Sequence, residues 1–364
     1  MKPTKPAAEV IPAVQGDHRY EVRVGPGALA PLAGLAEGHD QVAVFTARPV
    51  ARTPFARAAV RGLEATGKVK LVHVLPDGER GKTLAELGRA STALLAAGAT
   101  RRTLVVALGG GAVSDAAGFA AATFMRGVPW VAVPTTLLSM VDAAIGGKTG
   151  VNLPAMKNAV GAFHPPRAVL ADTAALETLP AREVRSGLGE VAKYALLQPA
   201  LLGRVAALGP RLPEPDLVAA CARMKVDVVA QDPIEKGPRK LLNLGHTFGH
   251  GVEAAGKFSR YTHGESVSIG MAFAFRLAAR LGRLGPLAVA EAEDALAALG
   301  LPVRLPPALA KRALALMATD KKRTAAGLRW VLPRAEGSAW VVDWDVAADA
   351  GAVEAAAREV SKSR

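Results

Sequence analysis

Four polar side chains that could do chemistry lie close together in the second half of the chain. They recur at intervals of four, three and four residues, which is the spacing of one helix face: Arg239, Asn243, His246 and His250. Leucine, phenylalanine and valine cover the rest of the predicted helix Leu241–Ala255. A polar face inside a packed body indicates a site rather than a solvated surface.

These imidazoles could bind a metal ion. His263 supplies a third one, thirteen residues after His250. Glu190, three residues before Lys193 in an apolar segment, is a hard oxygen ligand, although the pair could equally be an exposed ion pair. Catalytic zinc takes three protein ligands and keeps one position open. Spacing alone leaves two ligand sets open, namely Glu190 with both His246 and His263, or a local chelate of His246 with His250.

Two glycine-rich turns could hold phosphate. Gly109-Gly110-Gly111 follows an apolar run and opens a predicted helix, although Ser114 stands where the dinucleotide fingerprint has glycine, so a tight turn is the alternative. In Gly146-Gly147-Lys148-Thr149, Asp142 replaces a glycine that a nucleoside-triphosphatase loop requires. That class is therefore excluded, and Lys148 and Lys157-Asn158 are either phosphate contacts or solvated surface.

The elements that position these residues predict an α/β protein. In the first half, apolar runs alternate with alanine-rich helical segments, which predicts a Rossmann-like, doubly wound parallel sheet. The second half is mostly helical, so we expect an α/β domain over residues 1–180 and a mostly helical domain over 181–364. The predicted strands are Gln41–Phe45, Val69–Val74, Thr103–Leu108, Trp130–Val133, Leu328–Leu332 and Ala339–Val342. The predicted helices are Pro54–Thr66, Leu84–Ala97, Val113–Met125, Glu183–Leu197, Asp216–Ala230, Leu241–Ala255, Glu265–Leu281, Leu287–Leu299 and Ala308–Ala318.

Composition narrows the class of protein. The chain has 364 residues and a formal charge of +13, but it has no run of basic residues and only 4% aromatics, which argues against nucleic acid. Lysines and arginines gathered around an anionic small substrate are the better explanation. The lone Cys221 lies in an apolar helix and fits a reducing cytoplasm. No secretory leader is evident, and Thr103–Met125, the longest apolar stretch, is interrupted by glycines and Asp115, so we expect no membrane span.

Ordered blocks along nearly the whole chain resemble the 3-dehydroquinate synthase family of the sugar phosphate cyclase superfamily. The blocks are Pro76-Asp77-Gly78-Glu79 with Lys82, Gly109-Gly110-Gly111 with Asp115, Met125-Arg126-Gly127, Pro134-Thr135-Thr136-Leu137-Leu138 with Asp142, Gly146-Gly147-Lys148, Lys157-Asn158, Gly189-Glu190 with Lys193, Leu242-Asn243, Gly245-His246-Thr247, Gly249-His250, His263-Gly264-Glu265 and Asp320-Lys321-Lys322.

The resemblance implies a zinc or cobalt ion held by Glu190, His246 and His263, with His250 handling protons instead. It implies NAD bound by Asp77, Glu79, Lys82, Gly109, Gly110, Gly111, Asp115, Thr135, Thr136, Leu138, Asp142, Lys148, Lys157, Thr178 and Glu183. The substrate and catalytic groups would be Arg126, Asp142, Lys148, Asn158, Lys193, Lys225, Arg239, Asn243, His250 and Lys321, with Lys322 an alternative to Lys321. A homodimer is implied too, with Arg126 reaching the phosphate site of the neighbouring subunit.

The implied reaction converts 3-deoxy-D-arabino-heptulosonate 7-phosphate to 3-dehydroquinate and phosphate in the shikimate pathway. NAD would transiently oxidise the C5 hydroxyl, and phosphate elimination, re-reduction, ring opening and aldol closure would follow. Zinc would polarise the oxidised oxygen, Lys193 and Asp142 would balance charge, and Lys225 with Arg239 would hold the substrate carboxylate. The substrate phosphate would itself act as the base for elimination.

One departure concerns the nucleotide. The family has an acid or amide after the second strand of the fold, whereas this chain has Thr46-Ala47-Arg48, and arginine there can accept the 2′-phosphate of NADP. We expect NAD, with NADP left open. Other open alternatives are an amino analogue of the substrate, another sugar phosphate, a metal-dependent polyol dehydrogenase that releases NADH, and a non-enzymatic metal or anion-binding module.

Overall fold

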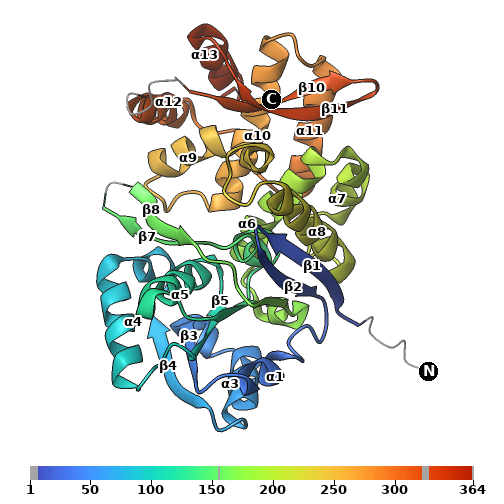
Figure 1. Ribbon diagram of the computed structural model, residues 1–364. Coiled ribbons are helices and arrows are strands. Elements are labelled where there is room, and N and C mark those ends of the chain that lie inside the picture. The colour runs from blue at the N-terminus through green and yellow to red at the C-terminus, as the bar shows by residue number, and fades with distance from the viewer. Residues whose placement is uncertain (1–6, 155, 322–327, 363–364) are drawn as a thin grey trace, which may run out of the picture. The chain divides into compact units, whose positions relative to one another are not determined.

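The computed structural model describes residues 7–154, 156–321 and 328–362, with the backbone alone for 318–321. The chain forms two compact units, labelled along their elements in Figure 1. The first comprises the chain up to Pro180 together with Glu214–Ile234, and the second comprises Ala181–Pro213 and the chain from Glu235 onward. The chain passes from the first unit to the second after Pro180, and Glu214–Ile234 belongs to the first unit.

The first unit is built on a seven-stranded sheet in the order β1-β2-β9-β6-β5-β3-β4. Every pair is parallel except β1 with β2, which confirms the predicted parallel α/β architecture. The antiparallel β1-β2 hairpin at one edge is an addition that the sequence analysis did not predict. The strands are β1 Glu9–Gln15, β2 His18–Val24, β3 Val42–Ala47, β4 Val69–Leu75, β5 Leu104–Gly109, β6 Trp130–Pro134 and β9 Ala168–Ala171.

Helices cover both faces of this sheet, as the blue-to-green ribbon of Figure 1 shows. Alternate residues of β3 and β5, such as Val44 and Val106, pack against α1 (Leu32–Glu37) and α3 (Pro54–Glu64) in one apolar cluster. The intervening residues point to the other face, where α4 (Leu84–Ala96) and α5 (Gly111–Thr123) contact the strands. The hydroxyl of Thr53 accepts a hydrogen bond from the Ala56 amide and so begins α3, with proline at its first position.

Shorter elements complete the first unit. They are α2 Arg48–Ala51, η1 Gly78–Gly81, η2 Phe124–Arg126, the π-helix η3 Ser139–Ala143, the hairpin β7 Lys148–Leu153 with β8 Met156–Phe163, and η4 Thr173–Thr178. The long helix α8 (Pro215–Gln231) packs against β1, β2 and η3. It carries Cys221, which is fully buried as expected.

The second unit is mostly helical. Its elements are α6 Ala181–Leu197, η5 Pro199–Leu201, α7 Leu202–Leu208, η6 Pro238–Asn243, α9 His246–Ala255, α10 His263–Arg280, α11 Pro286–Ala298, α12 Pro307–Lys321, β10 Trp330–Glu336, β11 Ala339–Val346 and α13 Ala350–Glu359. Helix α10 contacts α6, α9, α11 and α13 and is buried along most of its length. A capping box between Thr262 and Glu265 begins it.

The predicted helix Leu241–Ala255 is confirmed from His246 to Ala255, where it is α9, and is wrong before that. The chain leaves η6 at Leu244, Gly245 adopts a left-handed conformation with φ 79°, and α9 begins only at His246. A left-handed residue cannot continue a right-handed helix, so the repeat of polar side chains crosses a break. Arg239 and Asn243 therefore lie on a different element from His246 and His250. None of the helices in the described part of the chain has both the length and the apolar composition needed to cross a membrane.

Candidate functional site

Three potential metal ligands meet in the second unit, one from each of three helices. Glu190 lies in α6, and His246 and His263 are the first residues of α9 and α10. Oε1 of Glu190 is 3.6 Å from Nε2 of His246 and 3.3 Å from Nε2 of His263. One ligand atom from each residue lies within 4.8 Å of the others, so a single ion can reach all three. One carboxylate and two imidazoles are a donor set that zinc prefers.

A glycine precedes or follows each of these ligands and allows the backbones to approach closely. A Cβ on Gly189 would overlap the backbone of Gly264, and a Cβ on Gly264 would overlap the carbonyl of Ser186, so α6 and α10 touch beside Glu190 and His263. A Cβ on Gly245 would lie 2.6 Å from the Met271 side chain. The glycines thus bring three helices near enough for short side chains to share an ion.

The second ring nitrogen of each imidazole has its own partner. Nδ1 of His246 lies 3.2 Å from the carbonyl oxygen of Leu244, and Nδ1 of His263 lies 3.4 Å from Oε2 of the buried Glu253. These contacts turn both Nε2 atoms toward Glu190. Glu253 was missed by the sequence analysis, and its only signal is a carboxylate within an apolar stretch of α9.

Burial lowers the pKa of His246 to about 3, which leaves a neutral ring able to bind a metal. Burial would lower the pKa of His263 as well, but the hydrogen bonds with Glu190 and Glu253 outweigh it and raise that pKa to about 10. Without metal, His263 therefore carries a proton at neutral pH. A metal ion would take the place of that proton between the imidazole and Glu190.

A second group of potential ligands shares His263, with His250 and Glu253 as the other members. His250 is exposed, whereas Glu190 is 1% exposed and faces two imidazoles, so the first group surrounds an ion more completely. The rings of His246 and His250 lie edge to face with centroids 5.5 Å apart. Among the described residues, His246 shares a ligand group with Glu190 and His263 and not with His250.

Cationic and amide groups accompany these ligands in the second unit. Nζ of Lys193 contacts Oε2 of Glu190, and both side chains are 1% exposed. Arg239 is also 1% exposed, an unusual position for a guanidinium. The side-chain amide of Asn243 donates to Oε1 of Glu235 at 2.8 Å. Glu235 is a further residue that the sequence analysis missed, and nothing in its spacing distinguishes it.

The glycine turn of the first unit lies where β5 passes into α5. Gly110 precedes the first turn of α5, and a Cβ there would lie 2.9 Å from Cγ2 of Thr136. Glycine therefore lets the Thr136 side chain pack directly against the turn that begins α5. Nearby, Thr135 is buried and its hydroxyl has no hydrogen-bond partner among the described residues.

Lys82 organises a polar cluster beside α5. Its buried ammonium donates to Oδ2 of Asp115 at 2.7 Å and to the side-chain oxygen of Asn158. Burial raises the pKa of Asp115, against the opposing effect of the Lys82 charge. Glu79 accepts a hydrogen bond from Asn152, which joins η1 to the β7-β8 hairpin. The cluster brings Glu79, Lys82, Asp115 and Asn158 together, as a shared site would require.

A second ion pair of the first unit joins two predicted substrate contacts far apart in sequence. Nζ of the buried Lys225 on α8 lies 2.9 Å from Oδ1 of Asp142 in η3. Lys148 begins β7 and directly follows Gly146 and Gly147. Its side chain is exposed.

Two family models cover most of the chain. The model described as 3-dehydroquinate synthase N-terminal matches residues 72–186, and the one described as 3-dehydroquinate synthase C-terminal matches residues 187–323. The chain belongs to the 3-dehydroquinate synthase family. Membership brings the family's activity as a lyase of the shikimate pathway.

Curated members of the 3-dehydroquinate synthase family are similar over almost their whole length. The protein of that name from Xanthomonas oryzae is 46% identical over 359 residues, which cover 93% of this chain and 96% of that one. The one from Halorhodospira halophila is 44% identical over 336 residues, with 90% and 93% covered.

Solved structures of other sugar phosphate cyclases share the fold of this 3-dehydroquinate synthase family member. The 2-epi-5-epi-valiolone synthase of Streptomyces hygroscopicus, with NAD⁺ and Zn²⁺ bound, has a TM-score of 0.82 at 30% identity, covering 96% of this chain and 98% of that one. A 2-deoxy-scyllo-inosose synthase complexed with carbaglucose-6-phosphate, NAD⁺ and Co²⁺ gives 0.82 at 25% identity, covering 96% and 100%. Glycerol dehydrogenase from Schizosaccharomyces pombe, at 16% identity and a TM-score of 0.60, shares the fold alone.

The other residues that the family resemblance singled out lie on turns and element ends. Leu138 directly precedes η3, Asp77 precedes η1, and Lys157 lies in β8. Arg126 is exposed in a turn where Met125, Arg126 and Gly127 all have positive φ. Thr178 ends η4 in the first unit, and Glu183 is exposed in α6 of the second. The side chain of Lys321 and the whole of Lys322 lie outside the described residues.

Proposed function

We propose that the protein converts 3-deoxy-D-arabino-heptulosonate 7-phosphate to 3-dehydroquinate and phosphate by the redox-assisted elimination and aldol sequence that the family resemblance implies. The observation that carries the proposal is the convergence of Glu190, His246 and His263 on one point in a chain of this family. A carboxylate and two imidazoles leave an ion with an open position for a substrate oxygen. The phosphate-releasing reaction needs such a position.

Two cofactors belong to this proposal. The metal, zinc or cobalt, would be held by Glu190, His246 and His263, whose donor atoms fit it. NAD would lie at the glycine turn, where backbone amides begin α5 and where the buried Thr135 hydroxyl has no hydrogen-bond partner among the described residues. The solved cyclases that contain NAD⁺ with Zn²⁺ or Co²⁺ support both assignments. When bound, NAD takes and returns a hydride, and the metal polarises the oxygen that is oxidised.

Residues of the second unit would orient and charge-balance the substrate. The buried ammonium of Lys193, beside Glu190, can stabilise negative charge on an oxygen at the metal position. The guanidinium of Arg239 offers paired donors to a carboxylate. Asn243 is oriented by Glu235 and can offer its second amide hydrogen to a hydroxyl. The exposed His250, beside His246, can exchange protons with solvent.

Residues of the first unit would hold the nucleotide and the remaining anionic groups. Lys82 fixes Asp115 and Asn158 in a single cluster beside α5, and Glu79 extends it. We assign Asp142 and Lys225 to the substrate as a pair, because each holds the other at 2.9 Å. Lys148 and Lys157, on one hairpin, add positive charge for phosphate.

The alternatives differ in what is released. Sequence identity is 25–30% with the two other cyclases and 44–46% with the 3-dehydroquinate synthases. The higher identity favours the seven-carbon acid as substrate. An assay of phosphate and of absorbance at the NADH wavelength separates the classes. Phosphate release without net NADH supports the synthase. Accumulating NADH without phosphate would show a polyol dehydrogenase and end the proposal.

His246→Ala tests whether the ligands are catalytic or structural. We expect a folded variant with a native circular dichroism spectrum, little bound metal and a loss of phosphate release by at least a hundredfold. The matched control is Glu291→Gln, an exposed carboxylate on α11, which should keep both metal and activity. Retained activity in folded, metal-free protein would contradict the proposed mechanism, and unfolding would indicate a structural metal module.

We also propose a homodimer in the cytoplasm. Support for the dimer is the exposure of Arg126, whose guanidinium would contact the neighbouring subunit, and the buried Cys221 fits a reducing compartment. Light scattering should give twice the chain mass.

A further inference from the structure

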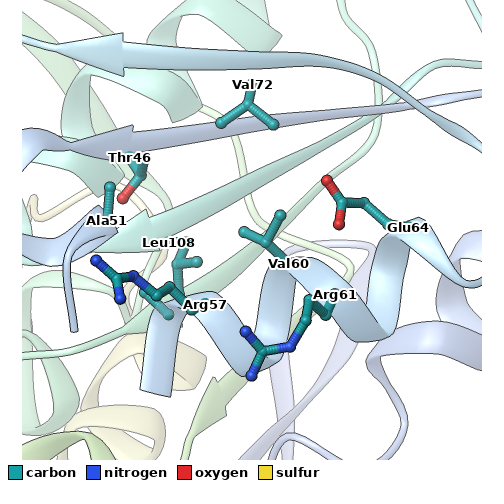
Figure 2. A pocket seen from close by; sticks show the side chains of 9 residues that line it. Thr46, Ala51, Arg57, Val60, Arg61, Glu64, Val72 and Leu108 are labelled. Atoms are coloured by element: carbon teal, nitrogen blue, oxygen red, sulfur yellow. The ribbon is translucent and has the colours of Figure 1, made fainter. Parts of the chain in front are cut away.

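A pocket of about 260 Å³ lies between the end of β3 and helix α3 in the first unit. Figure 2 shows it from close by, with Arg57 and Arg61 along the helix and Thr46 on the strand. Apolar groups line much of it, among them Val60, Val72 and Leu108. None of the roles proposed above uses this pocket.

Thr46 gives the first sign of a ligand. Its side chain is 1% exposed, and its hydroxyl has no hydrogen-bond partner among the residues that the structure describes. Buried hydroxyls almost always have a partner. Thr46 lines the pocket, so this hydroxyl can pair with a hydroxyl or phosphate oxygen of a ligand that reaches the end of β3.

Positive charge gives the second sign. Residues 41–63 contain no Asp or Glu, and their four arginines are Arg48, Arg52, Arg57 and Arg61. All four are exposed, and within the described part of the chain none has an ion pair or a side-chain hydrogen bond. Glu64 is the single carboxylate among the lining residues. Apolar lining residues can pack against a ring, and guanidinium groups can bind an anionic group attached to it.

The position of the pocket at the end of β3 indicates which ring it could bind. Thr46 pairs in register with Leu108 of β5, and the glycine turn follows Leu108 directly. Parallel strands end at the same edge, so a dinucleotide with its pyrophosphate at Gly110 has its adenosine beside the next strand, β3. An acid at that strand end binds the ribose 2′-hydroxyl and excludes a 2′-phosphate, whereas an arginine accommodates one. Here Arg48 follows the strand and Arg57 lines the pocket.

We propose that this pocket takes the adenosine end of the dinucleotide, and that Arg57 and Arg48 accept a 2′-phosphate, so that the protein binds NADP as well as NAD. The proposal rests on the proposed function, which places a dinucleotide at the glycine turn. It concerns the nucleotide's 2′ position alone and involves no change in the reaction.

Calorimetric titration of the full, nucleotide-stripped chain with NAD and with NADP tests it. We expect the Kd for NADP to lie within about tenfold of that for NAD. Arg57→Ala should raise the Kd for NADP at least tenfold and that for NAD less than threefold, and Arg48→Asp should act in the same direction. Arg101→Ala is the matched control, because Arg101 is exposed just before β5, at the amino ends of the parallel strands and away from the pocket's Thr46. This variant should change neither the Kd for NAD nor the Kd for NADP.

Two results would overturn the proposal while leaving the function intact. One is NADP binding more than a hundredfold weaker than NAD binding. The other is an equal effect of Arg57→Ala on both nucleotides. A third titration uses 2′-AMP on NAD-saturated protein, and undiminished binding there would show a separate anion site and also overturn it. If neither dinucleotide binds, the proposed function itself fails.

Discussion

Glu253→Gln should weaken metal binding although Glu253 is not one of the three ligands. Its carboxylate is 6% exposed and lies 3.4 Å from Nδ1 of His263, whose other nitrogen faces Glu190. A hydrogen bond to a charged group contributes roughly 1.5–3 kcal/mol and a neutral one about 1 kcal/mol. These values differ by about 0.5–2 kcal/mol, and a difference of about 1.4 kcal/mol corresponds to about tenfold in Kd. Glu253→Ala, which removes the acceptor, should approach about a hundredfold.

The assay is a competition titration of zinc against a chromophoric chelator, with circular dichroism to show that each variant is folded. Glu291→Gln, on the surface of α11, is the control for loss of one negative charge. A Kd within twofold of the parent would refute the argument that Glu253 fixes the His263 ring. If Glu253→Gln abolished binding while Glu190→Gln left it intact, the ion would belong instead to the group of His250, Glu253 and His263.

Three further outcomes follow from features of the two units. Gly264→Ala should separate α6 from α10, because the added Cβ overlaps the Ser186 carbonyl, and should lower the free energy of unfolding by about 1–3 kcal/mol and weaken metal binding. Its control is Gly88→Ala, in an open position of α4, which should raise the free energy of unfolding by about 0.5–1 kcal/mol. Equal melting temperatures of the two variants would contradict the packing argument. Zinc binding at pH 7 should release about one proton, because the pKa of His263 is raised to about 10 in the metal-free protein; calorimetry in buffers of different ionisation enthalpy measures it, and no release would count against the raised pKa. Glu293→Gln should lower the free energy of unfolding by about 3 kcal/mol at pH 7, because Arg276 and Arg304 lose a buried partner. Burial opposes the effect, but these arginines lower the pKa of Glu293, so its stabilisation is complete above the ordinary pKa of about 4.3 and is lost as the pH falls through the lowered pKa. Urea unfolding should therefore show a smaller difference in stability between parent and variant at pH 3 than at pH 7.

The strands next to the glycine turn could be predicted because they are buried on both faces. Continuous apolar runs such as Leu104–Gly109 leave little choice of structure. The break at Gly245 could not be predicted, since apolar and polar residues keep a helical period across it and only the backbone conformation interrupts it. The β1-β2 hairpin was not predicted, because a short alternating pattern is a weaker sequence signal for a strand than a continuous apolar run.

The candidate ligands could be named from sequence, but their grouping could not be chosen from spacing. His250 lies one helical turn from His246, which is good geometry for a chelate, yet His246 faces Glu190 and His263 because separate helices converge there. Glu253 and Glu235 act through partners whose proximity depends on the fold. Such contacts between segments leave no periodic trace.

The chain passes between the two units three times, after Pro180, after Pro213 and after Ile234. A single cut after Pro180 therefore cannot yield an intact first unit. The fragment up to Pro180 would lack α8, expose the apolar residues of β1 and β2 that α8 contacts, and leave Asp142 without Lys225. Engineering that exchanges one unit must therefore carry residues 214–234 with the first.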